Sequence, residues 1–252
     1  MEKRVPAELL DVSAISHALT GSYWRVSVLP EVTSTQDVLR TSNPSHGDVL
    51  VTEFQSAGRG RLDRSFVAAT STALLFSFYI EPKVNRESWS FIPLLVGINL
   101  TQLFNQKFSS KHYSTKWPND ILHNELKISG TIAEIHGSGV IIGVGINATM
   151  TSEQLPVPTA TSLLIAEGAS PNRNELLAEF LTGFAGLYAR WESGEDLLQE
   201  YTSTSSTISR LVEAHQPDGS RIQGTAIRID SRGALHLDSG AVIDIGDVVH
   251  LR

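Results

Sequence analysis

The sequence predicts an α+β fold in which helices pack on a sheet and a small all-β module follows. Three observations predict it. The run 72–80 is strongly apolar, as in a strand buried on at least one face, and 127–135 and 140–147 have the pattern of paired strands. The segments 87–106 and 172–192 carry apolar residues at helical spacing, which favours two long helices that cover the sheet. The final part of the chain contains short strand-like runs separated by tight turns.

The first third of the chain alternates helix and strand signals. Apolar residues recur at helical spacing in 7–20, and 23–32 alternates like a strand. Thr33 to Gln36 follows as a helix start, with hydroxyl side chains of the kind that cap helices. The run 48–54 is mostly apolar and strand-like, and it leads into a loop rich in glycine and arginine.

The remaining elements complete this outline. Pro118 cannot donate to a strand ladder, so the chain is expected to bend after Trp117. The patterns further predict the elements listed here: a turn at 123–125, a hairpin tip at 137–139, a polar connection at 151–158, a short helix at 161–168, a short segment at 195–201, and strands at 211–214, 221–229, 234–237 and 241–251. The last four strands predict an SH3-like barrel, so we expect two domains, 1–204 and 205–252.

Composition limits the classes of function. The 252 residues are 41% hydrophobic and 19% charged, which is ordinary for a globular protein with a sizeable core. The net charge of −7 disfavours nucleic acid as a partner. Cysteine is absent, which excludes disulfides, zinc–thiolate sites and cysteine catalysis. No apolar run reaches about 18 residues and no signal core is present, so we expect no membrane span and a cytoplasmic location.

Residues 56–66, called the arginine loop below, are the strongest local signal for a ligand. Gly58 and Gly60 allow the backbone to approach a ligand closely. Arg59, Arg61 and Arg64 supply planar, permanently charged donors suited to phosphate or carboxylate. Two interpretations are open at this point: a cover that orders over an anionic ligand, or a solvated basic loop between two strands.

Other residues gain weight from their positions. Ser34 and Thr35 stand at a strand-to-helix junction, where their hydroxyls either cap the helix or hold a polar ligand group. Lys127 begins a strand that is otherwise uncharged until Glu134. Gly143 and Gly145 lie two residues apart in a strand, a spacing that weakens packing unless something approaches closely.

Together these blocks resemble a biotin protein ligase of the bacterial class. The matching blocks, in order, are Ser34-Thr35-Gln36, Gln55 to Arg61, Lys116-Trp117-Pro118-Asn119-Asp120, Lys127 to Gly130, and Gly143 to Asn147. The resemblance covers roughly residues 25–150. It implies a mixed sheet flanked by helices, related to class II aminoacyl-tRNA synthetases. It also implies two reactions: biotin and MgATP give biotinyl-5′-AMP, which then biotinylates one lysine of a biotin carboxyl carrier protein.

The resemblance assigns roles residue by residue. The residues that match those catalysing the reaction are Arg59, Arg61 and Lys127. Those that match biotin-binding positions are Ser34, Thr35, Gln36, Gln55, Gly58, Arg59, Gly60, Arg61 and Lys127. Those that match nucleotide-binding positions are Arg64, Phe66, Asn119 and Asn147. The ligands of Mg²⁺ and any general base stay open, and Asp120 has either a metal-binding or a structural role.

The sequence departs from the family pattern within the arginine loop. Leu62 stands where a further cation is common, and Asp63 adds a carboxylate that can pair with Arg61 or Arg64. Phe66 replaces a tryptophan and lacks its indole donor. Thr131 replaces an aliphatic residue in the lysine strand.

Alternative functions differ in class. A lipoate–protein ligase has related chemistry, although the 116–120 block and the arginine loop favour biotin. A non-catalytic biotin-binding or nucleic-acid-binding protein needs neither Lys127 nor Asn147. Members of the family that repress transcription carry an N-terminal winged-helix domain, and only about 20 residues precede the first strand here. We therefore expect a ligase without DNA binding, whose partners are biotin, ATP and the carrier protein.

Overall fold

The computed structural model describes residues 8–61, 64–110 and 112–251. The chain divides into two compact units. The first contains residues 1–81 and 125–182, and the second contains residues 82–124 and 183–252. The division falls inside the helix α5 (Arg173–Glu192), which therefore contributes to both units.

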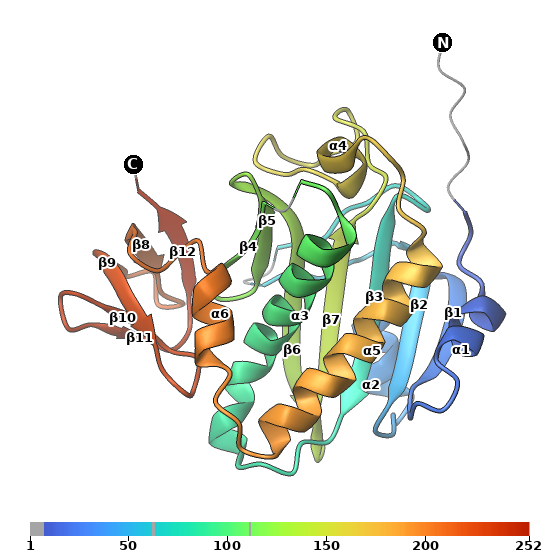
Figure 1. Ribbon diagram of the computed structural model, residues 1–252, viewed down its shortest axis with the longest axis horizontal. Helices are drawn as coiled ribbons and strands as arrows, with labels where there is room; N and C mark the ends of the chain where they lie inside the picture. Colours follow the sequence, from blue (N-terminus) through green and yellow to red (C-terminus); the bar gives the residue numbers. More distant parts are fainter. Residues whose placement is uncertain (1–7, 62–63, 111, 252) are drawn as a thin grey trace. The chain divides into compact units, whose positions relative to one another are not determined.

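The first unit is built on five strands in the order β1-β2-β3-β7-β6 (Figure 1). β1 and β2 are parallel, whereas the β2–β3, β3–β7 and β7–β6 pairs are antiparallel, so the sheet is mixed as the family resemblance implies. Its strands are β1 (Arg25–Val32), β2 (Asp48–Gln55), β3 (Ala73–Ile80), β6 (Leu126–His136) and β7 (Gly139–Asn147). Its helices are α1 (Val12–Ala18), α2 (Thr35–Thr41), α4 (Leu163–Glu167) and the first half of α5.

The two central strands, β3 and β7, form the core of this unit. Every residue of both strands is buried, which fits their nearly continuous apolar sequences. Phe76 and Phe78 of β3 pack edge-on against Phe180 of α5. The Trp24 indole N–H donates to the Leu181 carbonyl at 2.9 Å, which satisfies its polar atom within the same helix contact.

A buried ion pair ties the end of β2 to the start of α5. Arg173 Nη1 donates to Glu53 Oε2 at 2.7 Å, and the two side chains are only 1% and 10% exposed. Glu53 Oε1 also accepts from the backbone N–H of Leu10, and Arg173 Nη2 donates to the carbonyl of Glu8. The pair therefore fixes the segment before α1 as well as the strand and the helix.

The second unit holds one helical part and one small antiparallel sheet. The sheet has the strand order β11-β10-β9-β8-β12, in agreement with the predicted C-terminal β module. Its elements are η1 (Arg86–Phe91), α3 (Ile92–Lys107), β4 (Tyr113–Lys116), β5 (Asp120–His123), α6 (Leu198–Thr204), β8 (Leu211–His215), β9 (Arg221–Ile229), β10 (Leu235–Leu237), β11 (Val242–Ile243) and β12 (Asp247–His250). The boundary between domains expected at residue 205 stays a prediction.

Several elements differ at their ends from the sequence expectation. The helix expected from Ala7, a residue outside the described part, begins at Val12, because Asp11 caps it by accepting from two backbone N–H groups. The helix expected from Glu87 starts as the 3-10 turn η1. The strand expected at 241–251 is interrupted at Gly246, whose φ of 155° requires glycine, and forms β11 and β12.

Within the described residues, no helix is long and apolar enough to cross a membrane.

Arg173→Met is expected to destabilise the protein by about 3–5 kcal/mol, because it leaves the Glu53 carboxylate buried without its partner. Arg25→Met is the control, since Arg25 and Asp48 form an exposed pair 55% and 31% accessible and a loss of about 0–1 kcal/mol is expected. Urea unfolding at neutral pH measures both. The double variant Glu53→Gln/Arg173→Met should recover part of the loss; additive losses would contradict this account.

The same pair predicts a pH dependence. Burial raises the pKa of Glu53, but hydrogen bonds from Arg173, Leu10 and Ser71 outweigh it and hold the pKa below its ordinary value of 4.5. The contribution to stability is therefore fully present above the unfolded pKa and is lost as the pH falls through the folded pKa. The wild type should lose stability more steeply than Glu53→Gln below about pH 4, with a constant difference between them above about pH 6. Parallel urea titrations that keep a constant difference throughout would refute the assignment.

Candidate active site

A buried polar cluster joins the start of α2 to the end of β2. Gln55 Oε1 accepts from the backbone N–H of Thr35 at 2.7 Å and from Thr35 Oγ1 at 3.1 Å. Ser34, the N-cap residue, makes no side-chain capping hydrogen bond, so Gln55 supplies the acceptor that the helix start needs. Capping by Ser34, one of the two interpretations open from the sequence, is therefore not what the structure shows.

The cluster continues onto β3 and β7. Thr35 Oγ1 lies 2.7 Å from Ser77 Oγ, and because a hydroxyl has one hydrogen, which Thr35 gives to Gln55, Ser77 donates in this pair. Gln36 is 2% exposed, and its Oε1 is buried without a hydrogen-bond partner among the described residues. A Cβ built on Gly143 would lie 3.4 Å from that oxygen and 3.3 Å from Ser77 Oγ. The absence of a side chain at Gly143 thus keeps room beside an unsatisfied acceptor.

The described part of the arginine loop is bonded to itself and to β1. The Ser56 N–H donates to the carbonyl of Val32, the last residue of β1, at 3.0 Å, and the Ala57 N–H donates to the Thr33 carbonyl at 2.8 Å. Further on, the Phe66 N–H donates to the Gly58 carbonyl at 2.9 Å and the Gly60 N–H to the Arg64 carbonyl at 2.6 Å. A Cβ on Gly58 would collide with the Phe66 carbonyl oxygen, so this turn of the loop requires glycine.

Phe66 leaves the loop and covers β7. A Cβ built on Gly145 would lie between 2.7 and 3.0 Å from three atoms of the Phe66 ring. Phe66 also packs against the buried cluster of Ala68, Ala73, Leu75 and Met150. Gly143 and Gly145 lie on the same face of β7, so one serves the polar cluster and the other receives the phenyl ring.

Lys127 and Asn147 lie at the ends of β6 and β7. The backbone of Lys127 pairs with the 159–161 segment, and its side chain is partly exposed. Asn147 is 6% exposed, and its Nδ2 donates to the Thr161 carbonyl at 2.8 Å. Both residues therefore share the connection after β7 as a neighbour. The catalytic role of Lys127 and the nucleotide-binding role of Asn147 stay predictions.

The Lys116–Asp120 block belongs to the second unit, where it forms the turn between β4 and β5 and includes a cis Trp117–Pro118 peptide. Trp117 is 2% exposed; its backbone N–H donates to Thr207 Oγ1 at 3.0 Å and its indole N–H to the Gly233 carbonyl at 2.8 Å. Within this unit, Trp117 therefore anchors the β4–β5 turn to the segment before β8 and to the turn between β9 and β10. The nucleotide-binding role expected for Asn119 stays a prediction.

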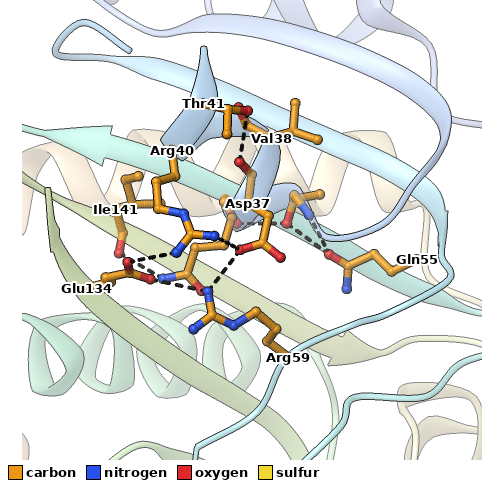
Figure 2. A network of polar contacts seen from close by, with 11 residues as sticks. Asp37, Val38, Arg40, Thr41, Gln55, Arg59, Glu134 and Ile141 are labelled. Carbon is orange, nitrogen blue, oxygen red and sulfur yellow. Dashed lines mark hydrogen bonds and ion pairs between the residues drawn. The ribbon is translucent and has the colours of Figure 1, made fainter. Parts of the chain in front are cut away.

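Arg59 is held by two carboxylates from different elements (Figure 2). Its Nη1 lies 3.0 Å from Asp37 Oδ1 of α2 and 3.3 Å from Glu134 Oε2 of β6. Arg40 contacts the same two residues, at 2.8 Å from Asp37 and 3.6 Å from Glu134. We call these four residues the Arg59 network; it contains two positive and two negative charges.

The structure describes only some of the residues at which the sequence departs from the family pattern. Leu62 and Asp63 lie outside the described residues. Thr131, in place of an aliphatic residue, is 3% exposed and stands opposite Val144 in the β6–β7 ladder. The remaining predicted site residues in the first unit fall near two places, the polar cluster and the arginine loop.

Sequence reasoning missed three residues of this region. Apart from Tyr79, Ser77 is the one residue with a hydroxyl group in the otherwise apolar run 73–80, and this isolation could have marked it as a site residue. Asp37 and Glu134 carried no signal, because charged residues on a helix and at a strand end are usually solvated.

Comparison with known proteins places the chain in a family. A sequence profile of the biotin/lipoate A/B protein ligase family matches residues 28–147. The biotin–[acetyl-CoA-carboxylase] ligase of Mycobacterium tuberculosis is 33% identical over 244 residues, which span 92% of this chain and 91% of that protein. The chain belongs to the biotin/lipoate A/B protein ligase family.

Other relatives of this family agree in sequence and in fold. The bifunctional ligase/repressor BirA of Escherichia coli is 27% identical over 98% of this chain and 79% of its own length. The solved structure of the biotin protein ligase from Aquifex aeolicus in complex with biotin and ATP is 26% identical, covers 90% of this chain and 99% of its own, and superposes with a TM-score of 0.77. These findings confirm the predicted family and fold class.

The roles of Gly143 and Gly145 in β7 can be distinguished by experiment. Gly143→Ala should crowd Gln36 and Ser77, whereas Gly145→Ala should displace the Phe66 ring. If the polar cluster binds biotin and Phe66 borders the nucleotide, Gly143→Ala raises KM for biotin and Gly145→Ala raises KM for ATP, each by about tenfold, since one misplaced contact costs about 1–3 kcal/mol. Steady-state kinetics with each substrate varied in turn measures both. Identical effects on both substrates would contradict the division.

Proposed function

We propose that this protein is a biotin–protein ligase that converts biotin and ATP to biotinyl-5′-AMP and transfers the biotinyl group to a lysine of a biotin carboxyl carrier protein. The Mycobacterium tuberculosis relative, named as a biotin–[acetyl-CoA-carboxylase] ligase, supports the activity over nearly the whole chain. The Aquifex aeolicus structure, in complex with biotin and ATP, supports the two small substrates. We further propose that the reaction takes place in the cytoplasm, with the carrier domain as the only macromolecular partner.

The observation that carries the proposal is the cluster of Thr35, Gln55, Ser77 and Gln36. It brings two of the matching sequence blocks into direct hydrogen bonding and offers neutral donors and acceptors in a buried place. The ureido ring of biotin is neutral and carries both N–H groups and a carbonyl. The unsatisfied Gln36 Oε1 can accept from such an N–H group, and a buried acceptor discriminates against ligands that cannot donate to it.

The charged residues suit the first chemical step. The biotin carboxylate attacks the α-phosphate, an oxygen–phosphorus bond forms, and pyrophosphate leaves with the electron pair of the broken bond. Two anions must approach, so positive charge at the reacting centre lowers the barrier. We assign this role to Lys127 and Arg61, and assign Arg59 to the same anionic groups. Arg64, Phe66 and Asn147 would contact the nucleotide.

The second step needs no further cofactor. The carrier lysine attacks the acyl carbon of the mixed anhydride, an amide forms, and AMP leaves. A closed arginine loop would exclude water, which competes with the lysine for the anhydride. The lysine must lose a proton in this step, because only the neutral amine is a nucleophile.

Mg²⁺ accompanies ATP in this chemistry and neutralises charge on the phosphates. Among the residues that the structure describes, no group of three or more His, Asp or Glu side chains gathers as a metal cage. Isolated carboxylates fit an ion that is held mainly by the nucleotide phosphates and water, with one or two protein oxygens, as is usual for Mg²⁺. Asp120 is partly exposed and stays a candidate for that contact.

A direct assay tests the function. The purified protein is mixed with a biotin carboxyl carrier domain, biotin, ATP and Mg²⁺, and the mass of the carrier is measured. A gain of one biotinyl group on one lysine supports the proposal. Lipoate in place of biotin tests the related rival activity, and omission of the carrier tests for free biotinyl-5′-AMP. A carrier modified only by lipoate would overturn the proposed substrate.

Lys127→Ala should lower the rate of biotinyl-5′-AMP formation about 10²–10³-fold, because it removes one charge-stabilising donor at the α-phosphate. The fold should persist, since the β-bridge from Lys127 to Ala160 uses backbone atoms only. Lys83→Ala, at an exposed lysine in the second unit, is the control. Pyrophosphate release in single-turnover reactions reports the step. A near-normal rate for Lys127→Ala would remove this residue from the site.

A further inference from the structure

We propose that Asp37 and Glu134 are positioning residues that hold Arg59, and through it the start of the arginine loop, over the candidate biotin site. The inference rests on the proposed function, because it concerns retention of biotin and of the adenylate at that site. It assigns a role to two carboxylates that neither substrate nor nucleotide needs to touch.

The contacts converge on one guanidinium nitrogen. Arg59 Nη1 lies 3.0 Å from Asp37 and 3.3 Å from Glu134, so a single group bridges α2 and β6. Figure 2 shows the Arg59 side chain pointing from the loop toward both carboxylates. Since these carboxylates engage only Nη1, they do not occupy Nη2 and Nε. Arg59 can therefore keep both contacts while its other donors face an anion.

One anchor point lies on an element of the polar cluster, and the other lies on the strand paired with β7. Asp37 follows Thr35 and Gln36 on α2. Glu134 stands opposite Ile141 in the β6–β7 ladder, and the Ile141 carbonyl lies 3.5 Å from Gln36 Nε2. The guanidinium is thus fixed beside α2 and beside the strand pair whose Ile141 carbonyl approaches Gln36. Movement of Arg59 away from Asp37 and Glu134 would release the loop without disturbing the cluster itself.

Arg40 makes the arrangement a network rather than two isolated pairs. It contacts Asp37 at 2.8 Å and Glu134 at 3.6 Å, so both carboxylates remain near a cation when Arg59 leaves. The two carboxylates are therefore kept in place for the return of Arg59. Their side chains are about 30% exposed, and each exposed ion pair stabilises only weakly. Loss of both carboxylates should change the opening equilibrium of the loop by roughly three- to tenfold, not abolish catalysis.

The test compares Asp37→Asn/Glu134→Gln with the wild type, with Asp37→Glu and with a matched control. Asp48→Asn is the control, because Asp48 also pairs with an arginine at 2.8 Å and has the same 31% exposure as Asp37. The first measurement is the rate of trypsin cleavage after the loop arginines in the ligand-free protein. Cleavage reports the population of the open loop when opening is fast relative to proteolysis. The second measurement is KM and kcat for biotin in adenylate synthesis.

The double variant should be cleaved about three to ten times faster, raise KM for biotin by a similar factor, and keep kcat within about twofold. Asp37→Glu, which keeps both carboxylates, should show little of either effect, whereas a purely structural role for Asp37 would not tolerate the longer side chain in this selective way. Cleavage at the wild-type rate, or an equal acceleration in Asp48→Asn, would overturn the proposal. A lower KM for biotin would also overturn it, because the carboxylates would then withhold Arg59 from the substrate.

The two readouts separate this inference from the proposed function. Trypsin cleavage of the ligand-free loop does not depend on what the enzyme acts on. A protein that makes no biotinyl-5′-AMP but shows faster loop cleavage in the double variant would refute the function and leave the positioning role intact. Normal ligase activity of the wild type together with unchanged loop cleavage in the double variant would support the function and refute the positioning role.

Discussion

The hydrogen bonds from Thr35 to Gln55 Oε1 are the contact on which the candidate site depends. They fix the first turn of α2 against the last residue of β2, immediately before the arginine loop begins. The same threonine reaches Ser77 on the buried strand β3. Gln55 Oε1 and Thr35 Oγ1 together therefore connect the helix, the central strand β3 and the base of the loop. A change in the position of Gln55 would move all three together, which is why this amide is more than a substitute for a helix cap.

The first unit supports this contact through buried apolar strands and one buried charge pair. β3 and β7 form the buried centre of the sheet, where Ser77 and Gly143 border the polar cluster and Gly145 receives the Phe66 ring. The charged residues of the site lie around this centre, on α2, on β6 and in the loop. Under the proposed function, the buried amide and hydroxyl groups would recognise the neutral ring of biotin, and the partly exposed cations would stabilise the reacting anions.

Most of the fold could be predicted from the pattern of apolar residues in the sequence, whereas many of the hydrogen bonds and ion pairs of the site could not. Apolar runs and helical spacing identify β3, β7 and α5, because burial of apolar surface dominates their placement. Spaced glycine and arginine residues identify the loop. No local pattern shows that Gln55 caps α2 in place of Ser34, or that Asp37 and Glu134 meet Arg59, since these residues are 20 or more positions apart and their types are common on surfaces. The cap of α1 by Asp11 is local, but the bond from the Leu10 N–H to Glu53 just before it is a tertiary contact that no local pattern shows.

The Glu53–Arg173 pair has a consequence for how this sequence can change over time. Either residue alone is an uncompensated charge in a buried place, so a lineage that loses one passes through a destabilised intermediate. Replacement of both by apolar residues of similar volume is energetically accessible, but only as a coupled step. Among related sequences, positions 53 and 173 should therefore covary as a pair, either both charged or both uncharged, although 120 residues separate them.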